Sequence, residues 1–172
     1  ASRLGRIGTA APGATAPALV RTVRGVEIAL LGYYEVDWKQ AYREVEAQKQ
    51  AGRVVVVFNH WGMEDLVSPT GAQRSFAHGL VDAGADLVVG AHAHVVQPEE
   101  TYRGKLIAYG LGDFVFNGTA CQPKRSVGAV LEVDLTKEGV AAHATRRVHL
   151  DARGAPHFMA PDEAEPTSTG CR

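Results

Sequence analysis

Two short apolar runs along the chain each end in histidine. The first reads RVVVVFNHWGMED from Arg53 and places His60 after the apolar residues; the second reads ADLVVGAHAH and delivers His92 and His94. Short apolar runs without polar interruption are typical of strands that are buried on both faces of a sheet. The pattern therefore predicts two buried strands with histidines at their C-terminal ends.

The segment between the two runs predicts a helix. Ser68 before Pro69 is its expected start, Gly84 is its expected end, and the apolar spacing is that of Phe76, Ala77, Leu80 and Val81. A helical crossover of this length makes the two strands parallel, so their C-terminal ends lie at one edge of the sheet.

We therefore expect His60, His92 and His94 to lie together at the edge where α/β sheets usually bind ligands. An extended backbone would also turn the two histidines of the H-x-H spacing to one side. Three imidazoles directed at one point form a candidate site for a divalent metal. The alternative is that these are unrelated surface histidines.

The flanking sequence adds further elements. Residues 18–34 predict two strands around a turn, and Asp37 is expected to cap a helix over 38–51. After the histidines we expect a strand over 106–109, a glycine-rich loop over 110–113 and an antiparallel hairpin over 128–150. Residues 151–172 have too few apolar side chains to pack and predict a disordered tail.

Composition narrows the class of protein. The chain has 172 residues, a net charge of −1 and no basic run, which argues against nucleic-acid binding. It contains no apolar segment of membrane-spanning length, no G-x-S-x-G and no P-loop. Cys121 and Cys171 are either paired or free thiols.

Three motifs carry a resemblance to a known family. They are HWGMED-x-x-x-P-x-x-x-Q from His60 to Gln73, DAGADLVVGAHAHVVQ from Asp82 to Gln97, and YRGKLIAYGLGDFVF from Tyr102 to Phe116. Through them, residues 20–150 resemble the CapA or PgsA type of poly-γ-glutamate capsule synthesis protein. The resemblance implies the fold of the calcineurin-like metallophosphoesterases, an αββα sandwich of two sheets flanked by helices.

The chain departs from the family pattern in three places. Where the family usually reads Gly-His-His-Pro-His, residues 90–94 read Gly-Ala-His-Ala-His, and Tyr-Gly-Leu-Gly-Asp-Phe at 109–114 stands for Tyr-Ser-Leu-Gly-Asn-Phe. The early Gly-Asp, Asn-Glu and Asn-Asn-His elements of the family are not in this sequence. We therefore expect residues 1–150 to form the C-terminal portion of such a domain, which would pair with the missing N-terminal half.

The resemblance also implies site residues. His60, His92 and His94 would be metal ligands for manganese, iron or zinc. Two ions are possible if the missing half supplies further ligands, because a two-metal site needs a bridging carboxylate. Glu64 would act with His60 in catalysis as general base, ligand support or substrate contact, against the alternative of a solvated carboxylate. Two interpretations of Asp113 stand side by side: it adds negative charge near the metal, or it is an ordinary turn residue.

The remaining polar residues suggest structural roles. Asp65 is an ordinary carboxylate, Gln73 and Gln97 are expected to orient loops, and Trp61 and Tyr109 either line a cleft or are simply buried. The other histidines are expected to be structural or solvated: His78, His143, His149 and His157.

Three functions follow as hypotheses. The first is a capsule biosynthesis component that is extracellular or anchored at the cell surface, with a polyanionic polymer or a small-molecule substrate and a capsule synthase complex as partners. The second is a metal-dependent hydrolase of another phosphoester or amide, since a fold alone does not fix a reaction. The third is a non-catalytic scaffold.

Overall fold

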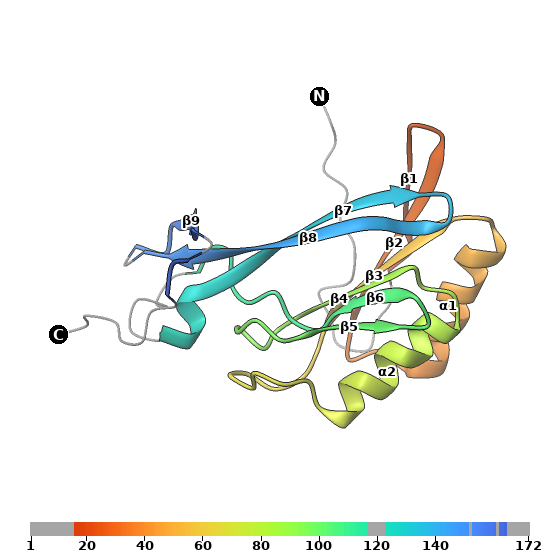
Figure 1. The fold of residues 1–172 in the computed structure, drawn as a ribbon. Coiled ribbons are helices and arrows are strands. Elements are labelled where there is room, and N and C mark those ends of the chain that lie inside the picture. The colour runs from red at the N-terminus through yellow and green to blue at the C-terminus, as the bar shows by residue number, and fades with distance from the viewer. Residues whose placement is uncertain (1–15, 117–122, 152, 161, 165–172) are drawn as a thin grey trace.

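The computed structural model describes residues 16–116, 123–151, 153–160 and 162–164. Two sheets and two α-helices make up this part of the chain (Figure 1). The larger sheet contains β1 (Leu19–Val23), β2 (Val26–Tyr34), β3 (Val54–His60), β4 (Leu87–Ala91), β5 (Glu99–Tyr102) and β6 (Lys105–Ala108). The smaller sheet contains β7 (Val127–Thr136), β8 (Gly139–Leu150) and β9 (Pro156–Phe158), and a short 3₁₀ helix, η2 (Pro123–Ser126), precedes it.

The larger sheet has the strand order β1-β2-β3-β4-β6-β5. Its four central strands are parallel, and β1 and β5 pair antiparallel at the two edges. The parallel pairing of β3 with β4 confirms the predicted crossover and sets His60 opposite Ala91. The C-terminal ends of both strands therefore lie at one edge of the sheet.

Helices α1 (Trp38–Gln50) and α2 (Gly71–Asp82) cover one face of this sheet. Asp37 caps α1, as predicted, by accepting a hydrogen bond from the Gln40 backbone N–H. The predicted start of α2 at Ser68 is wrong, because Thr70 is its N-cap. The Thr70 hydroxyl accepts from the Gln73 backbone, and the Gln73 side chain accepts from the Thr70 N–H, which together form a capping box.

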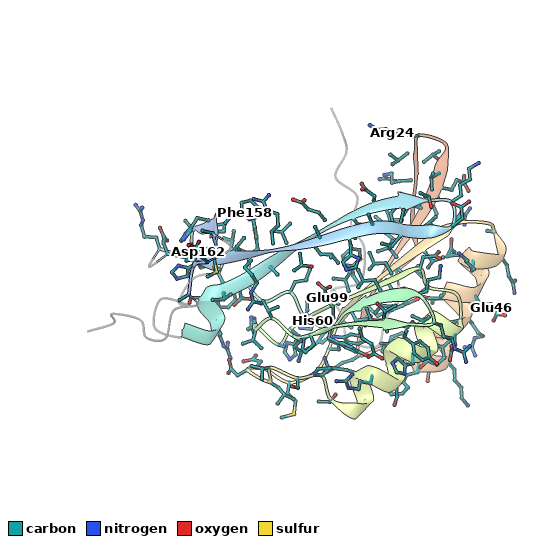
Figure 2. All side chains as sticks on the ribbon, viewed as in Figure 1. Arg24, Glu46, His60, Glu99, Phe158 and Asp162 are labelled. Carbon is teal, nitrogen blue, oxygen red and sulfur yellow. The ribbon has the colours of Figure 1, made fainter. Side chains whose placement is uncertain are left out.

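The three-stranded sheet crosses the other face of the larger sheet (Figure 1). The hairpin of β7 and β8 confirms the prediction over 128–150, and β9 adds a third strand within the segment 151–172. Phe158, on β9, and Glu46, on α1, lie toward opposite sides of the view in Figure 2, and His60 lies between them. Cys121 and Cys171 lie outside the described residues, so their pairing stays open.

An apolar groove of about 370 Å³ lies between the two sheets. Its walls include Phe58 of β3, which is 39% exposed, Leu30 of β2 and Leu131 of β7. Among the described strands, β7 pairs with β8 alone, so the strand that lines this groove also has an unpaired edge.

A buried carboxylate fixes the opposite end of the sheet. The Asp86 side chain is 0% exposed and accepts hydrogen bonds from Lys49 and Lys105, each at 2.7 Å, and from the Val55 N–H at 2.9 Å. A buried charge with this many partners joins α1, β3 and β6 at one point.

Candidate metal centre

The three histidines converge at the C-terminal edge of the central strands, as predicted. His60 ends β3, and His92 and His94 follow β4. The ring centroids of His60 and His92 lie 4.5 Å apart, and those of His92 and His94 lie 6.1 Å apart. The sheet topology thus brings together side chains that are more than thirty positions apart in the sequence.

His92 and His94 do converge, but the prediction that an extended strand turns both side chains to one side is wrong. β4 ends at Ala91, and both His92 (φ 97°) and His94 (φ 58°) have left-handed backbone conformations. Such conformations are uncommon outside glycine and cluster at functional sites. A tight loop, and not a period of two in an extended strand, directs the two imidazoles.

Glu64 joins this cluster from the loop after β3. The ligand atoms of Glu64, His92 and His94 all lie within 4.8 Å of one another, and Glu64 Oε1 is 4.0 Å from His94 Nε2. Two imidazole nitrogens and a carboxylate oxygen are a donor set that suits zinc, iron or manganese. His60 lies beside this group through its contact with His92.

Asp113 orients His94. Its Oδ1 lies 2.8 Å from His94 Nδ1, and a carboxylate only accepts, so Nδ1 carries the proton and Nε2 keeps its lone pair for the centre. Carboxylates that hold the outer nitrogen of a histidine are typical of metal sites. The other carboxylate oxygen, Oδ2, is buried without a hydrogen-bond partner in the described part of the chain. Of the two readings of Asp113, the geometry favours the one beside the metal edge.

Arg125 of η2 is a site residue that the sequence did not indicate. It donates to both Asp65 oxygens at 2.7 Å and to Glu64 Oε2 at 2.8 Å. The hydrogen bond and positive charge of Arg125 lower the pKa of Glu64, and the two carboxylates raise the pKa of Arg125. Glu64 is therefore held as an anion with one oxygen toward His94.

His60 stays neutral more readily than an isolated histidine. Partial burial and then the neighbouring imidazoles of His92 and His94 lower its pKa. The neutral form is the one that binds a metal or accepts a proton. Tyr34 packs edge-on against the ring at 4.9 Å and limits its movement.

The predicted loop-orienting amides lie behind the centre. Gln73 donates to Gln97 Oε1 at 3.1 Å, and Gln97 donates to the Leu66 carbonyl at 2.7 Å. Trp61 donates through its indole nitrogen to the Tyr109 carbonyl at 2.9 Å. These bonds join the loops after β3, β4 and β6.

The other four histidines lie away from this edge. His78 stacks on Tyr102 at 3.8 Å, and His143 lies 3.4 Å from Glu99. His149 of β8, His157 of β9 and Glu163 form a second group whose ligand atoms lie within 4.8 Å of one another. Any metal measurement on this chain therefore needs variants of both groups.

This chain is an α/β protein with a candidate metal centre. The centre is formed by nitrogen and oxygen donors at the ends of the parallel strands. Residues 2–118 match the family model of the bacterial capsule synthesis protein PGA_cap, and the chain belongs to that family. The resemblance read from the three motifs is thereby confirmed.

Named relatives agree with this assignment. The PGA biosynthesis protein CapA of Bacillus subtilis is 38% identical over 135 residues, which cover 68% of this chain and 35% of the relative. The capsule biosynthesis protein CapA of Bacillus anthracis is 38% identical over 107 residues, or 62% of this chain and 26% of the relative. The matched part of the chain thus spans about a third of the length of the first relative and about a quarter of the second.

A solved structure shares the fold. A hypothetical protein from Thermus thermophilus superimposes with a TM-score of 0.54 at 13% identity, covering 76% of this chain and 61% of that protein. No helix in the described part of the chain is long and apolar enough to cross a membrane.

Proposed function

We propose that this chain is part of a poly-γ-glutamate capsule biosynthesis protein of the CapA type with a metal-dependent, phosphoesterase-like centre. Its ligands are His60, His92 and His94, with Glu64 beside them. The observation that carries the proposal is the Glu64, His92 and His94 group, whose ligand atoms lie within 4.8 Å, together with the Asp113 carboxylate on the outer nitrogen of His94.

The residues fit manganese, iron or zinc. A divalent ion held here supplies a Lewis acid for a phosphoryl or carbonyl oxygen. The neutral imidazole of His60 has one lone pair, which can either bind the ion or accept a proton, and the Glu64 anion is suited to bind an ion or contact a substrate. Arg125 restrains Glu64 through a hydrogen bond of 2.8 Å.

The apolar groove supports the proposal that a further part of the domain completes the fold. Apart from Arg21, the groove is lined by apolar side chains of both sheets, and β7, which supplies Leu131, has one edge without a partner among the described strands. Strands of the N-terminal half of the family domain would extend the smaller sheet over Phe58 and Leu30, giving the αββα sandwich. Residues 1–150 then form its C-terminal portion, and 151–172 follow it.

Capsule synthesis also suggests a place and partners for the whole protein. The relatives are named as PGA and capsule biosynthesis proteins, which favours association with the cell surface. The partners we propose are the polyanionic polymer or a small-molecule substrate and a capsule synthase complex.

Elemental analysis of protein purified without chelator tests the centre. We expect manganese, iron or zinc in the wild type and its loss in His92→Ala/His94→Ala. The matched control is His149→Ala/His157→Ala, which removes two histidines from the second group and should keep the metal. Metal that is lost only in the control would overturn the assignment, as would a wild type that cannot be loaded.

Hydrolysis separates the catalytic hypotheses from the scaffold. Metal-loaded chain, alone and mixed with the N-terminal half of the family domain, is assayed with p-nitrophenyl phosphate and bis-p-nitrophenyl phosphate. Turnover that His60→Ala abolishes supports a phosphoesterase. Metal binding without turnover in either sample, together with binding of poly-γ-glutamate, indicates a scaffold in capsule synthesis.

A further inference from the structure

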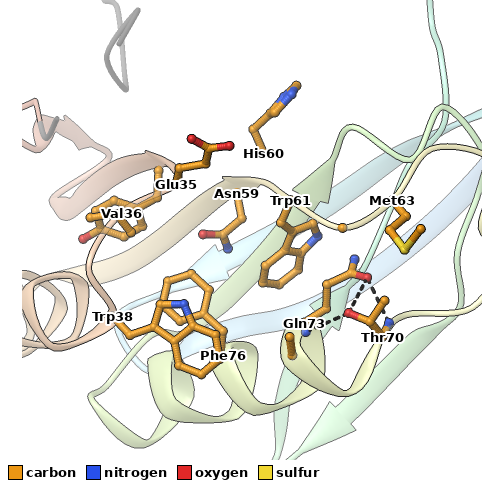
Figure 3. Close-up of a pocket in the computed structure, with 13 residues that line it drawn as sticks. Glu35, Val36, Trp38, Asn59, His60, Trp61, Met63, Thr70, Gln73 and Phe76 are labelled. Atoms are coloured by element: carbon orange, nitrogen blue, oxygen red, sulfur yellow. Dashed lines mark hydrogen bonds between the residues drawn. The ribbon is translucent and has the colours of Figure 1, made fainter. Parts of the chain in front are cut away.

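A cavity of about 330 Å³ lies on the helix side of the sheet, next to the histidines. It opens between the end of β3 and the first turns of α1 and α2, and its walls include Trp38, Trp61 and Phe76 (Figure 3). His60 contributes to its rim, but its ring points away from the aromatic side chains (Figure 3). The cavity is therefore a neighbour of the candidate metal centre and not a part of it.

Asn59 is the unusual residue of this cavity. It is 3% exposed, and neither its amide nitrogen nor its amide oxygen has a hydrogen-bond partner in the described part of the chain. Because successive side chains of a strand alternate between faces, Asn59 points toward Trp38 and Phe76 while His60 points the other way (Figure 3). Buried amides are nearly always hydrogen-bonded, so this amide calls for a partner in the cavity, which a water or a polar group of a ligand can supply.

The other hydrogen-bonding side chains of the cavity are largely engaged. Tyr33 donates to Glu44 at 3.1 Å, and Trp61 donates to the Tyr109 carbonyl. Thr70 and Gln73 cap α2 through each other. Asn59 is thus the polar group of the cavity wall with both a donor and an acceptor to offer.

The walls favour a flat group. Trp38 stacks on Phe76 with a centroid distance of 5.0 Å and an interplanar angle of 17°, and Trp61 meets Phe76 edge-on at 6.1 Å. Trp61 packs directly on Gly90, where an added Cβ would overlap the indole nitrogen. Rigid aromatic faces of this kind bind planar groups at low cost in conformational entropy.

The charged side chains around the cavity disfavour a ligand that carries a carboxylate. Among the described residues, no lysine or arginine lines the cavity, whereas the carboxylate of Glu35 does. A ligand carboxylate would lie near this anion without a cation to pair with, whereas a neutral amide can accept from and donate to Asn59 at once.

We propose that this cavity is a binding site for an uncharged, planar group that carries an amide, recognised by the side-chain amide of Asn59 and lying against the aromatic wall of Trp38, Phe76 and Trp61. Binding there does not require the metal, so the site stands apart from the hydrolase proposal. A ligand seated in it lies next to His60 and the metal edge.

Benzamide is the probe, because it combines a flat ring with one amide. Trp38 and Trp61 are the two tryptophans of the chain and both line the cavity, so their fluorescence reports on it directly. In protein kept metal-free with chelator, we expect saturable fluorescence quenching by benzamide, shifted side-chain amide signals of Asn59 in NMR spectra, and no saturable effect of benzoate.

Asn59→Leu removes both amide atoms at nearly constant volume and should weaken benzamide binding by about tenfold or more. Its melting temperature should not fall, because the amide has no partner to lose. Equal binding of benzamide and benzoate, unchanged binding by Asn59→Leu, or absence of saturation would overturn the proposal. If the variant does not fold, the Asn59 signals of the wild type decide the question alone.

Discussion

Removal of the Asp113 carboxylate should weaken metal binding while leaving the fold intact. Asp113 holds His94 Nδ1 at 2.8 Å and thereby directs Nε2 to the centre, so Asp113→Ala frees the ring to rotate. Loss of such an outer carboxylate typically costs 10–100-fold in metal affinity, which is about 1.4–2.7 kcal/mol.

The effect on stability should be small. Asp113 Oδ2 is buried without a partner in the described structure, so the variant loses one hydrogen bond but also removes a poorly solvated oxygen. These two effects oppose each other, and we expect the free energy of unfolding of the metal-free protein to change by less than about 1 kcal/mol.

Calorimetric titration of metal-free protein with Mn²⁺ and Zn²⁺ measures the affinity, and urea denaturation measures the stability. Asp134→Ala, which removes an exposed carboxylate from β7, is the matched control and should bind like the wild type. A dissociation constant of Asp113→Ala within about threefold of the wild type would refute the orienting role of this carboxylate.

Three further predictions concern the frame of the site. Asp86→Asn should lower the free energy of unfolding in urea by about 3–5 kcal/mol, because a buried carboxylate with charged partners is lost. A change below about 1 kcal/mol would contradict this role of Asp86. Gly90→Ala should lower the melting temperature and break the hydrogen bond from Trp61 to the Tyr109 carbonyl, since the new Cβ would overlap both that backbone oxygen and the indole nitrogen. An unchanged melting temperature with an unchanged tryptophan spectrum would argue against this. The pKa of Glu100 is lowered, chiefly by a hydrogen bond from Tyr109. The ionised Glu100 side chain therefore stabilises the fold above its usual pKa of 4.5, and this stabilisation is lost as the pH falls through the lowered pKa. The gap in melting temperature between wild type and Glu100→Gln should therefore close in acid, and a constant gap across the pH series would contradict this.

The parts of the fold that were predictable are those marked by sequence patterns within a few neighbouring residues. Asp37 before α1 and the alternation of β7 and β8 act within a few residues, and the sequence shows them directly. The meeting of His60 with His92 was predictable as well, because a helical crossover leaves parallel strands little choice of edge. The start of α2 was missed although Thr70 and Gln73 have the spacing of a capping box.

The finer geometry of the site depends on contacts between distant residues. Arg125 lies 60 positions after Asp65, and no local pattern marks it as a partner of the loop after β3. The left-handed conformations of His92 and His94 likewise depend on the loops packed around them. Asn59 was not singled out from the sequence, although strand alternation turns it to the face opposite His60.

The donors at this edge suit one ion better than two. A pair of cations about 3.5–4 Å apart needs a carboxylate between them. Asp113 Oδ1 is bound to His94 and Glu64 Oε2 is bound to Arg125, so neither carboxylate can bridge two ions through both of its oxygens without losing its present contact. A two-ion centre would then take its bridging carboxylate from the N-terminal half of the domain that we propose above. If that half packs in the apolar groove between the two sheets, the same association would complete both the core and the metal centre.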